Sequence, residues 1–354
     1  MDTRLTDRMA GAPLAALSDP QGRRIDYVRL SVTDRCNYRC TYCMPEAGIE
    51  HADRADILSF EEIVAIVRCF AALGVRRLRI TGGEPTVRRD LVSLVRKLRG
   101  IPGIDDLALS TNGHLLPELA ADLRAAGVAR LNISVDTLDP ERFARITRRG
   151  DLSRVLAGID AARAAGFAII KINTVAIKGF NDGEVAALCD YAWRRGLVPR
   201  FIEQMPMAGG EMFIPGELLS AQEIRDLVRA AYPGATLVAE DGGSARGAGP
   251  ARYWRVEGAA PATVGAPPRR FGIISAMTEH FCDACNRVRL SASGALHACL
   301  GYDDAVDLRA TLSDEGEAGV IAAIRRAVSG KRPAHSFGLL GIGGPRKSMI
   351  SIGG

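Results

Sequence analysis

The stretch YVRLSVTDRCNYRCTYCMP, residues 27–45, joins an apolar strand pattern to three closely spaced cysteines. Its first six residues have the length and composition of a buried β-strand. Cys36, Cys40 and Cys43, called here the first cysteine set, follow directly, so their thiols come from one loop. Thiolates at this spacing can reach three corners of an iron–sulfur cluster. Because such clusters usually take four cysteines, one iron is left open for another ligand.

Five more strand-like runs follow within residues 25–204, and helical patterns separate them. These runs are residues 78–81, 107–110, 131–135, 168–175 and 198–203. Alternating strands and helices predict a parallel sheet with its functional groups at the carboxyl ends of the strands. Six such units are fewer than the eight of a closed barrel. We therefore expect an α/β fold built on a partial (βα)6-type TIM barrel.

The helical patterns carry their own start and stop signals. Ser59 and Glu62 form the Ser-x-x-Glu pattern of a capping box, ahead of apolar residues at helical spacing. Residues 115–126 and 153–165 have similar patterns, and each is followed by a glycine that suits a helix C-terminus. These signals support the alternation of strands and helices.

The composition changes at residue 241, and Gly, Ala and Pro dominate as far as residue 270. This composition predicts loops on both sides of one strand at 252–256. We expect a partial barrel at 20–240 and a C-terminal α+β extension at 241–354. The extension holds three more cysteines, two helical stretches and a Gly-rich tail.

Charge and hydropathy exclude several classes of protein. The 354 residues carry a net charge of +5, from 46 basic and 41 acidic side chains, which is too mild for a nucleic-acid binder. No apolar run is long enough to cross a membrane, and the first residues lack the apolar segment of a secretory signal. We expect a cytoplasmic protein that binds neither membrane nor nucleic acid, in which eight cysteines are not disulfides.

A second cysteine set, Cys282, Cys285 and Cys299, lies in the C-terminal region. It again offers three thiols without an obvious fourth. Zinc is the alternative, with Asp283 and either His280 or His297 completing the site. The remaining cysteines, Cys69 and Cys189, lie in helical patterns and are expected to be small core residues.

Two arginines follow the second cysteine set closely. Arg287 and Arg289 are two residues apart, so on an extended segment their side chains point the same way. Guanidinium groups bind phosphate oxygens in a bidentate fashion. A solvated strand face would explain this pair by itself, but the neighbouring cysteines favour a phosphate site.

The first cysteine set resembles the signature of the radical S-adenosylmethionine (SAM) superfamily, with Tyr42 as the aromatic residue before the last cysteine. A second motif, Thr81-Gly82-Gly83-Glu84-Pro85, follows the next strand and strengthens the resemblance. Adjacent glycines let the backbone approach a ligand closely, and Glu84 offers an acceptor for an ammonium group. The resemblance implies a cluster that cleaves SAM to methionine and a 5′-deoxyadenosyl radical.

The similarity extends to one family of that superfamily, the GTP 3′,8-cyclases of molybdenum cofactor biosynthesis, over residues 17–354. It rests on NRVR after Cys285 and on segments such as KINTVAIKGFND, FIEQMP and GPARYW. The family resemblance implies a lyase that converts GTP to (8S)-3′,8-cyclo-7,8-dihydroguanosine 5′-triphosphate, with SAM and two [4Fe-4S] clusters. It also implies a low-potential electron donor and cyclic pyranopterin monophosphate synthase as the next enzyme. A homodimer is left open.

The resemblance also assigns binding residues, although it names no catalytic residue. The two cysteine sets hold the clusters. Residues expected to bind SAM are Tyr42, Gly83, Ser134 and Met205. Residues expected to bind GTP are Arg29, Arg79, Ser110, Lys171, Arg287, Val288 and Arg289. The Gly353-Gly354 end is expected to reach into the barrel near the substrate.

Two other functions stay open at this point. One is a two-cluster radical SAM enzyme that modifies a peptide, which would need a peptide groove and typically has more C-terminal cysteines. The other is a zinc- or cluster-bearing module that binds nucleic acid. The Ala/Pro-rich stretch 257–270 looks longer than the family requires, which leaves its loop geometry undetermined.

Overall fold

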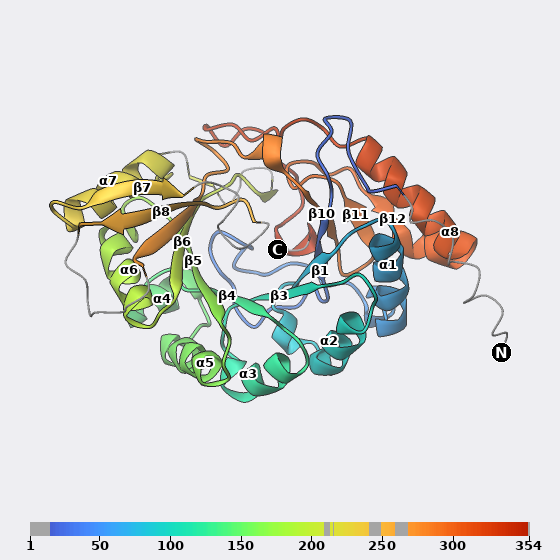
Figure 1. The fold of residues 1–354 in the computed structure, drawn as a ribbon, viewed down its shortest axis with the longest axis horizontal. Coiled ribbons are helices and arrows are strands. Elements are labelled where there is room, and N and C mark those ends of the chain that lie inside the picture. Colours follow the sequence, from blue (N-terminus) through green and yellow to red (C-terminus); the bar gives the residue numbers. More distant parts are fainter. Residues whose placement is uncertain (1–14, 209–212, 215, 241–248, 259–267, 353–354) are drawn as a thin grey trace.

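A twelve-stranded sheet runs through the part of the chain that the computed structural model describes (Figure 1). The described residues are 15–208, 213–214, 216–240, 249–258 and 268–352. The strands are β1 (Tyr27–Ser31), β2 (Arg77–Thr81), β3 (Asp106–Thr111), β4 (Arg130–Ser134), β5 (Ile169–Ala176), β6 (Val198–Glu203), β7 (Thr236–Glu240), β8 (Arg252–Glu257), β9 (Arg270–Ile274), β10 (Arg287–Leu290), β11 (Ala295–His297) and β12 (Val306–Asp307).

The strand order is β12-β11-β10-β1-β2-β3-β4-β5-β6-β9-β8-β7. Strands β1 to β6 lie in chain order and are parallel, which confirms the partial barrel. The sequence undercounted the parallel strands, because β10 pairs with β1 and β9 pairs with β6 in the same direction. Both strands come from the C-terminal region, where strands and helices do not alternate, so the sequence pattern did not predict parallel strands there. That region therefore extends both edges of the barrel sheet.

Helices cover the convex face of the curved sheet (Figure 1). They are α1 (Phe60–Ala72), α2 (Leu91–Arg99), α3 (Leu116–Ala125), α4 (Pro140–Thr147), α5 (Leu152–Ala164), α6 (Val185–Arg194), α7 (Ala221–Ala231) and α8 (Leu308–Ser329). The expected helices at 115–126 and 153–165 agree with α3 and α5 within a residue at each end. Helix α8 contains a non-helical residue, Gly316, with φ 67°, so it consists of two helical stretches, as the sequence predicts.

Helix α1 shows how local sequence and packing agree. The Ser59 hydroxyl accepts from the Glu62 amide, and the Glu62 carboxylate accepts from the Ser59 amide, so the capping box is present. Its apolar stripe, which includes Ile63 and Phe70, is fully buried in the core between sheet and helices. Burying one such side chain stabilises the fold by about 1.5–3 kcal/mol. Cys69 and Cys189 are also buried, as expected of core residues.

The last described residues return to the barrel. Met349 and Ile350 line the central cavity, and Ile352 is buried. Gly353 and Gly354, for which the sequence predicts insertion near the substrate, lie outside the described residues, as does most of the stretch 257–270. In the described part of the chain, no helix is long and apolar enough to cross a membrane.

Candidate active site

One cavity of about 320 Å³ extends from the carboxyl ends of the barrel strands, where Thr81 and Ser134 lie, to the amino end of β10, where Arg287 lies. Every cysteine of the first and second sets lines it, although more than 230 residues separate the two sets in sequence. The first set follows the carboxyl end of β1, whereas Cys282 and Cys285 precede the amino end of β10. Because β10 is parallel to β1, and Cys299 follows β11, which is antiparallel to β10, the second set lies at the opposite end of the strands from the first.

The loop that carries the first cysteine set is fixed at several points. The amides of Arg39 and Thr41 donate to the carbonyl oxygens of Thr147 and Ile146, each at 2.9 Å. The Tyr38 hydroxyl lies 3.1 Å from His114 Nδ1. These contacts tie the loop to helix α4 and to the β3–α3 connection, so the thiols are held in place by the protein.

The glycines of the Thr81–Pro85 turn are needed for a contact within the protein. A Cβ on Gly82 would lie 2.6 Å from the Thr33 carbonyl oxygen, and one on Gly83 would lie 2.4 Å from the Arg35 carbonyl oxygen. The Gly83 amide donates to Thr33 at 2.8 Å. Backbone approaches backbone here, just before Cys36, so the turn supports the cysteine loop. Both glycines also line the cavity, where a ligand can approach them.

The Glu84 carboxylate is already engaged by the protein. Its Oε1 accepts from the Thr86 amide at 3.0 Å and from the Thr86 and Thr111 hydroxyls at 2.6 and 2.7 Å. Its Oε2 accepts from the Asn112 amide at 2.6 Å. Burial nevertheless raises the pKa of Glu84 above its ordinary value. Glu84 thus fixes the turn as well as lining the cavity.

Burial dominates the chemistry of the first cysteine set. It raises the pKa of the Cys36 thiol to about 11 and that of Cys43 to about 12. Asp136 lies nearby, with its pKa raised to about 6 by burial, and it accepts from the Tyr42 hydroxyl at 2.7 Å. The amide of Val175 donates to the same carboxylate at 2.8 Å. Thiols in such surroundings ionise only with a strong electrophile such as iron beside them.

The second cysteine set has cationic neighbours. Burial opposes ionisation of Cys285, but the charges of Arg287 and Lys331 outweigh it and lower the pKa of that thiol. Cys282, by contrast, has a pKa raised by burial. The carbonyl oxygen of Cys282 accepts from Arg23 Nη1 at 2.7 Å. The second set therefore lies in a positive part of the cavity.

The zinc alternative adds histidines to this set. His280 Nδ1 lies 2.9 Å from the Ala276 carbonyl oxygen and 3.0 Å from His335 Nε2. Asp283 is exposed, and His297 is buried. Within the described residues, no group of three or more His, Cys, Asp or Glu side chains is arranged to hold a single metal ion.

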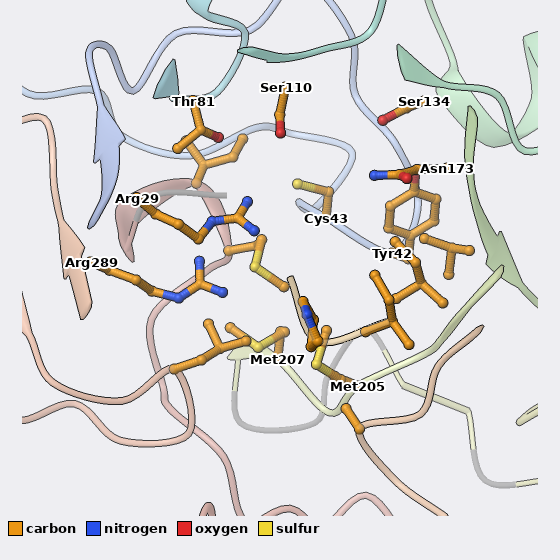
Figure 2. A pocket seen from close by; sticks show the side chains of 18 of the residues that line it. Arg29, Tyr42, Cys43, Thr81, Ser110, Ser134, Asn173, Met205, Met207 and Arg289 are labelled. Carbon is orange, nitrogen blue, oxygen red and sulfur yellow. The ribbon is translucent and has the colours of Figure 1, made fainter. Parts of the chain in front are cut away.

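Three arginines form a row across neighbouring strands. Arg289, Arg29 and Arg79 are in register on β10, β1 and β2, and all three line the cavity. Figure 2 shows Arg29 and Arg289 extending side by side into the cavity, with the Ser110 and Ser134 hydroxyls on other sides of it. We call these three residues the arginine row.

The arginine row places three like charges on adjacent strands. Burial and the charges of Arg289 and Arg79 lower the pKa of Arg29 well below its ordinary value. Burial and Arg287 lower the pKa of Arg289 to about 10. In the described part of the chain, the buried Nε atoms of Arg29, Arg79 and Arg287 have no hydrogen-bond partner. Burying like charges together is costly, so this row is suited to a ligand with several negative charges.

Lys171 lies in a related cluster beside the row. It is buried, and its ammonium lies 5.4 Å from the centre of the Tyr253 ring. Burial and the charge of Arg200 lower the pKa of Lys171 to about 8. Burial opposes ionisation of Tyr253, but Arg200 and Lys171 outweigh it and lower its pKa to about 8. Tyr253 is itself buried against the Lys171 ammonium, and this contact helps to hold the lysine in place.

The structure brings most of the residues that the sequence singled out to this one cavity. Its lining includes Cys36, Cys40, Cys43, Cys282, Cys285, Cys299, Tyr42, Gly83, Ser134, Met205, Arg29, Arg79, Ser110, Arg287 and Arg289. Lys171 is beside the arginine row but is not among the lining residues. Val288 has its side chain in the hydrophobic core, on the face of β10 opposite Arg287 and Arg289.

Arg200 and Asp136 are among the residues of this region that sequence reasoning missed. Arg200 is fully buried and donates to Asn173 Oδ1 at 2.6 Å and to Asn132. A lone cation within the apolar run VPRFIE could have identified it, by the same argument as Arg29 and Arg79. Asp136, the partner of Tyr42, directly follows the strand pattern LNISV, where a carboxylate at a strand end is typical of a functional edge.

The residues present fit the groups that the sequence implies. Three half-buried thiols that line the cavity beside a glycine turn suit an iron–sulfur cluster with an open iron. The unpartnered guanidinium nitrogens of Arg29 and Arg79 suit a polyanion. Both features exist in the protein before any ligand binds.

Family models match two successive parts of the chain. The radical SAM superfamily matches residues 30–192, and Molybdenum Cofactor Synthesis C matches residues 198–337. Together they cover the barrel strands β2 to β6 and both edges of the sheet.

Relatives of high similarity share one description. The chain is 44% identical to a GTP 3′,8-cyclase of Pelotomaculum thermopropionicum over 96% of its own length and 100% of the relative. It is 50% identical to a GTP 3′,8-cyclase of Ectopseudomonas mendocina, with 84% of this chain and 85% of the relative covered. A Rhodopseudomonas palustris GTP 3′,8-cyclase is 45% identical, over 91% of this chain and 90% of the relative.

Among solved structures, the chain is similar to Streptococcus suis SuiB bound to its precursor peptide SuiA. The TM-score is 0.59 at 15% identity, with 90% of this chain and 70% of that chain covered, so the likeness concerns the fold alone. The sequence identities above are far higher and extend over nearly the whole chain. With its two cysteine sets facing one cavity, this chain belongs to the GTP 3′,8-cyclase family of the radical SAM superfamily.

Proposed function

We propose that this chain cyclises GTP to (8S)-3′,8-cyclo-7,8-dihydroguanosine 5′-triphosphate in molybdenum cofactor biosynthesis. The observation that carries the proposal is a single cavity with a three-cysteine set on each side and a row of buried arginines within it. Family membership supports the same reaction, because the relatives are GTP 3′,8-cyclases. GTP is an anion with a long charged tail, which matches the arginine row.

The first cysteine set would hold a [4Fe-4S] cluster whose open iron binds SAM. Gly83, Ser134 and Met205 line the cavity and are proposed to position SAM there, together with Tyr42. Asp136 accepts from the Tyr42 hydroxyl at 2.7 Å, which fixes the orientation of that ring. These residues orient the cofactor, and burial keeps water away from it.

The triphosphate would lie along the arginine row. Arg289, Arg29 and Arg79 are neighbours on three adjacent strands, so successive phosphates can each meet a guanidinium. Lys171 and Arg200 add two buried charges beside the row, and Tyr253 contacts the Lys171 ammonium. Ser110 offers a hydroxyl within the same cavity. Val288 can contribute only through its backbone, because its side chain is in the core.

A second [4Fe-4S] cluster is proposed on the second cysteine set. It would hold the guanine end of the substrate, since Arg287 and Arg289 extend from the strand that follows Cys285. The chain would then divide by role, with the radical SAM barrel at 20–240 and the substrate cluster and tail at 241–354. Zinc at this set is the outcome that would overturn the assignment.

When bound, SAM and its cluster would supply a radical able to take a hydrogen atom from C3′ of the ribose. Bonding of C3′ to C8 of guanine would leave a radical on the purine, and one electron from the low-potential donor together with one proton would complete the dihydro product. The protein's part is to hold ribose and base between the two cysteine sets and to exclude water. Met349 and Ile350, near the end of the chain, line the cavity and help to close it. A low-potential donor and cyclic pyranopterin monophosphate synthase would be the partners, and the cytoplasm the compartment.

Anaerobic incubation with SAM, a reductant and GTP tests the proposal directly. We expect 5′-deoxyadenosine and a cyclised guanosine triphosphate, identified by mass spectrometry and NMR. GTP deuterated at C3′ should transfer deuterium to 5′-deoxyadenosine. Formation of 5′-deoxyadenosine without a GTP-derived product, or with label only from other ribose positions, would contradict the proposed reaction.

A further inference from the structure

Arg23 links the second cysteine set to two distant parts of the chain. It lies within the turn that the β-bridge between Ser18 and Arg24 closes. Its Nη1 donates to the Cys282 carbonyl oxygen and to that of Pro333, both at 2.7 Å. Its Nη2 donates to the Arg332 carbonyl oxygen at 2.8 Å. One guanidinium thus joins the N-terminal segment, the first cysteine of the set and the segment after α8.

Lys331 links the other two cysteines of the set. Its Nζ donates to the Arg287 carbonyl oxygen at 3.2 Å and to the Ala298 carbonyl oxygen. Arg287 lies two residues after Cys285, and Ala298 immediately precedes Cys299. Together with Arg23, whose contacts reach the residues next to Lys331, the two cations hold all three cysteine segments in one arrangement.

The charge of Lys331 is not balanced by a carboxylate. The residue is only 3% exposed, and within the described residues it forms no ion pair. Arg23 is also buried and is paired with Asp19 at 2.5 Å. Burying an ammonium group among neutral carbonyls is costly unless a negative group completes the site. A cluster bound by three thiolates would supply that negative charge.

The first cysteine set has a different environment. Glu84 and Asp136 line the cavity there and are buried. Two cations donate to carbonyl oxygens of this loop, Arg39 to that of Cys36 at 3.0 Å and Arg148 to that of Met44 at 3.2 Å, but both are only half-buried, whereas Arg23 and Lys331 are buried. Local charge is one of the factors that set the reduction potential of an iron–sulfur cluster. Nearby cations favour the reduced, more negative state, and nearby carboxylates disfavour it.

We propose that Arg23 and Lys331 are positioning residues of the second cysteine set, which preform the cluster site and raise its reduction potential above that of the first. This inference rests on the proposed function, since it requires a cluster at the second set. It gives the two clusters different potentials through side chains that contact the backbone of the cysteine segments. The second cluster would then be reduced first but would be the weaker reductant, which leaves reductive cleavage of SAM to the first cluster.

Potentiometric titration followed by EPR tests the charge, in the reconstituted full-length protein. Lys331→Met removes the charge and both hydrogen bonds, whereas Lys331→Gln keeps a donor without the charge. Both variants should shift the second cluster to a more negative potential and leave the first cluster unchanged. Lys97→Met is the matched control, because Lys97 is partly exposed and pairs with Glu61 on the outer helices, and it should shift neither.

Iron and sulfide content tests the positioning. Lys331→Met and Arg23→Gln should lose part of the second cluster, and Lys331→Gln should retain more of it than Lys331→Met. The first cluster serves as an internal standard for folding, since its EPR signal should persist in every variant. Unchanged potential and unchanged iron content in Lys331→Met would overturn the inference.

The proposed function fails by a different result. If the wild-type protein shows no second iron–sulfur cluster, or keeps it after replacement of Cys282, Cys285 and Cys299, the two-cluster assignment is wrong. If the second cluster depends on these cysteines but is unaffected by replacement of Lys331 and Arg23, only the positioning role of Lys331 and Arg23 is contradicted.

Discussion

The two cysteine sets line one cavity, but the charged side chains around each set differ. The first lies beside Glu84 and Asp136, two buried carboxylates, and burial raises the pKa of its thiols. The second lies beside Arg23, Arg287 and Lys331, and the pKa of Cys285 is lowered despite burial. Each set has three thiols, and the different surroundings suit the two sets to different tasks. A site that must reduce a sulfonium benefits from a low potential, whereas a site that must hold an anionic nucleotide benefits from positive charge.

The largest expected effect separates the two sets by activity. Replacing Cys36, Cys40 or Cys43 with Ala should abolish 5′-deoxyadenosine formation, because the SAM-binding cluster loses a ligand. Replacing Cys282, Cys285 or Cys299 should spare part of it but stop formation of cyclised GTP. Both products can be quantified in the same anaerobic assay by liquid chromatography. Equal loss of 5′-deoxyadenosine formation in the variants of both cysteine sets would contradict the different roles proposed for the two sets.

The end of the chain should matter for the substrate half of the comparison. Deleting Gly353 and Gly354, or changing either to Ala, is expected to impair GTP cyclisation, since glycine alone can thread a crowded site without side-chain clashes. Cluster content and thermal stability should stay near those of the wild type. A synthetic peptide that matches the last residues should restore part of the activity. If the truncated protein is fully active without peptide, the tail has no role at the site.

A smaller effect is expected from the phosphate-binding side chains. Arg287→Ala and Arg289→Ala should each weaken GTP binding by about 1.5–3 kcal/mol, roughly 10- to 150-fold in Kd, because a charge-assisted hydrogen bond is lost. SAM binding should barely change, which calorimetry on the reconstituted protein can measure. Arg255→Ala is the control, since Arg255 forms an exposed ion pair with Glu257. Parallel losses for GTP and SAM would indicate a folding defect.

The smallest effect concerns pH. Lys171 and Tyr253 are in contact, and each has a pKa lowered to about 8. Below that pH the ammonium is charged and the phenol neutral. As pH rises through it, loss of a proton from either group lowers the net charge of this pair by one unit. GTP affinity should therefore fall above about pH 8, by at most about tenfold per pH unit.

Tyr253→Phe sharpens this prediction. The hydroxyl of Tyr253 supports the charged form of Lys171, so its removal should lower the pKa of Lys171 further and move the loss of GTP affinity to lower pH. SAM affinity should show no such dependence in either protein. A GTP affinity that stays constant from pH 7 to 9 in the wild type would contradict the role given to this pair.

Much of the fold could be predicted from the sequence, because local signals were sufficient. Apolar runs and capping residues identified β1 to β6 and α1, since a buried strand and a capped helix each leave a short-range pattern. The edge strands β9 and β10 could not be placed that way. Their parallel pairing with β6 and β1 depends on contacts between segments far apart in sequence.

The site was predictable to the extent that motifs are local. Cys36, Cys40 and Cys43 share one loop, and Arg287 and Arg289 share one strand, so spacing alone carried information. The sequence did not predict the role of Arg23 and Lys331, because both contact carbonyl oxygens of remote residues. Every residue has a backbone carbonyl oxygen, so such a contact leaves no sequence pattern. Such positioning residues emerge only when distant segments are seen together.

The most direct test of the central claim is the metal content of anaerobically reconstituted protein. Two [4Fe-4S] clusters correspond to about eight iron and eight sulfide per chain. Replacing all three cysteines of either set with Ala should reduce both counts to about four, with the other cluster's Mössbauer spectrum unchanged. About four iron in the wild-type protein, or zinc bound at the second cysteine set, would contradict the account of one cavity between two clusters.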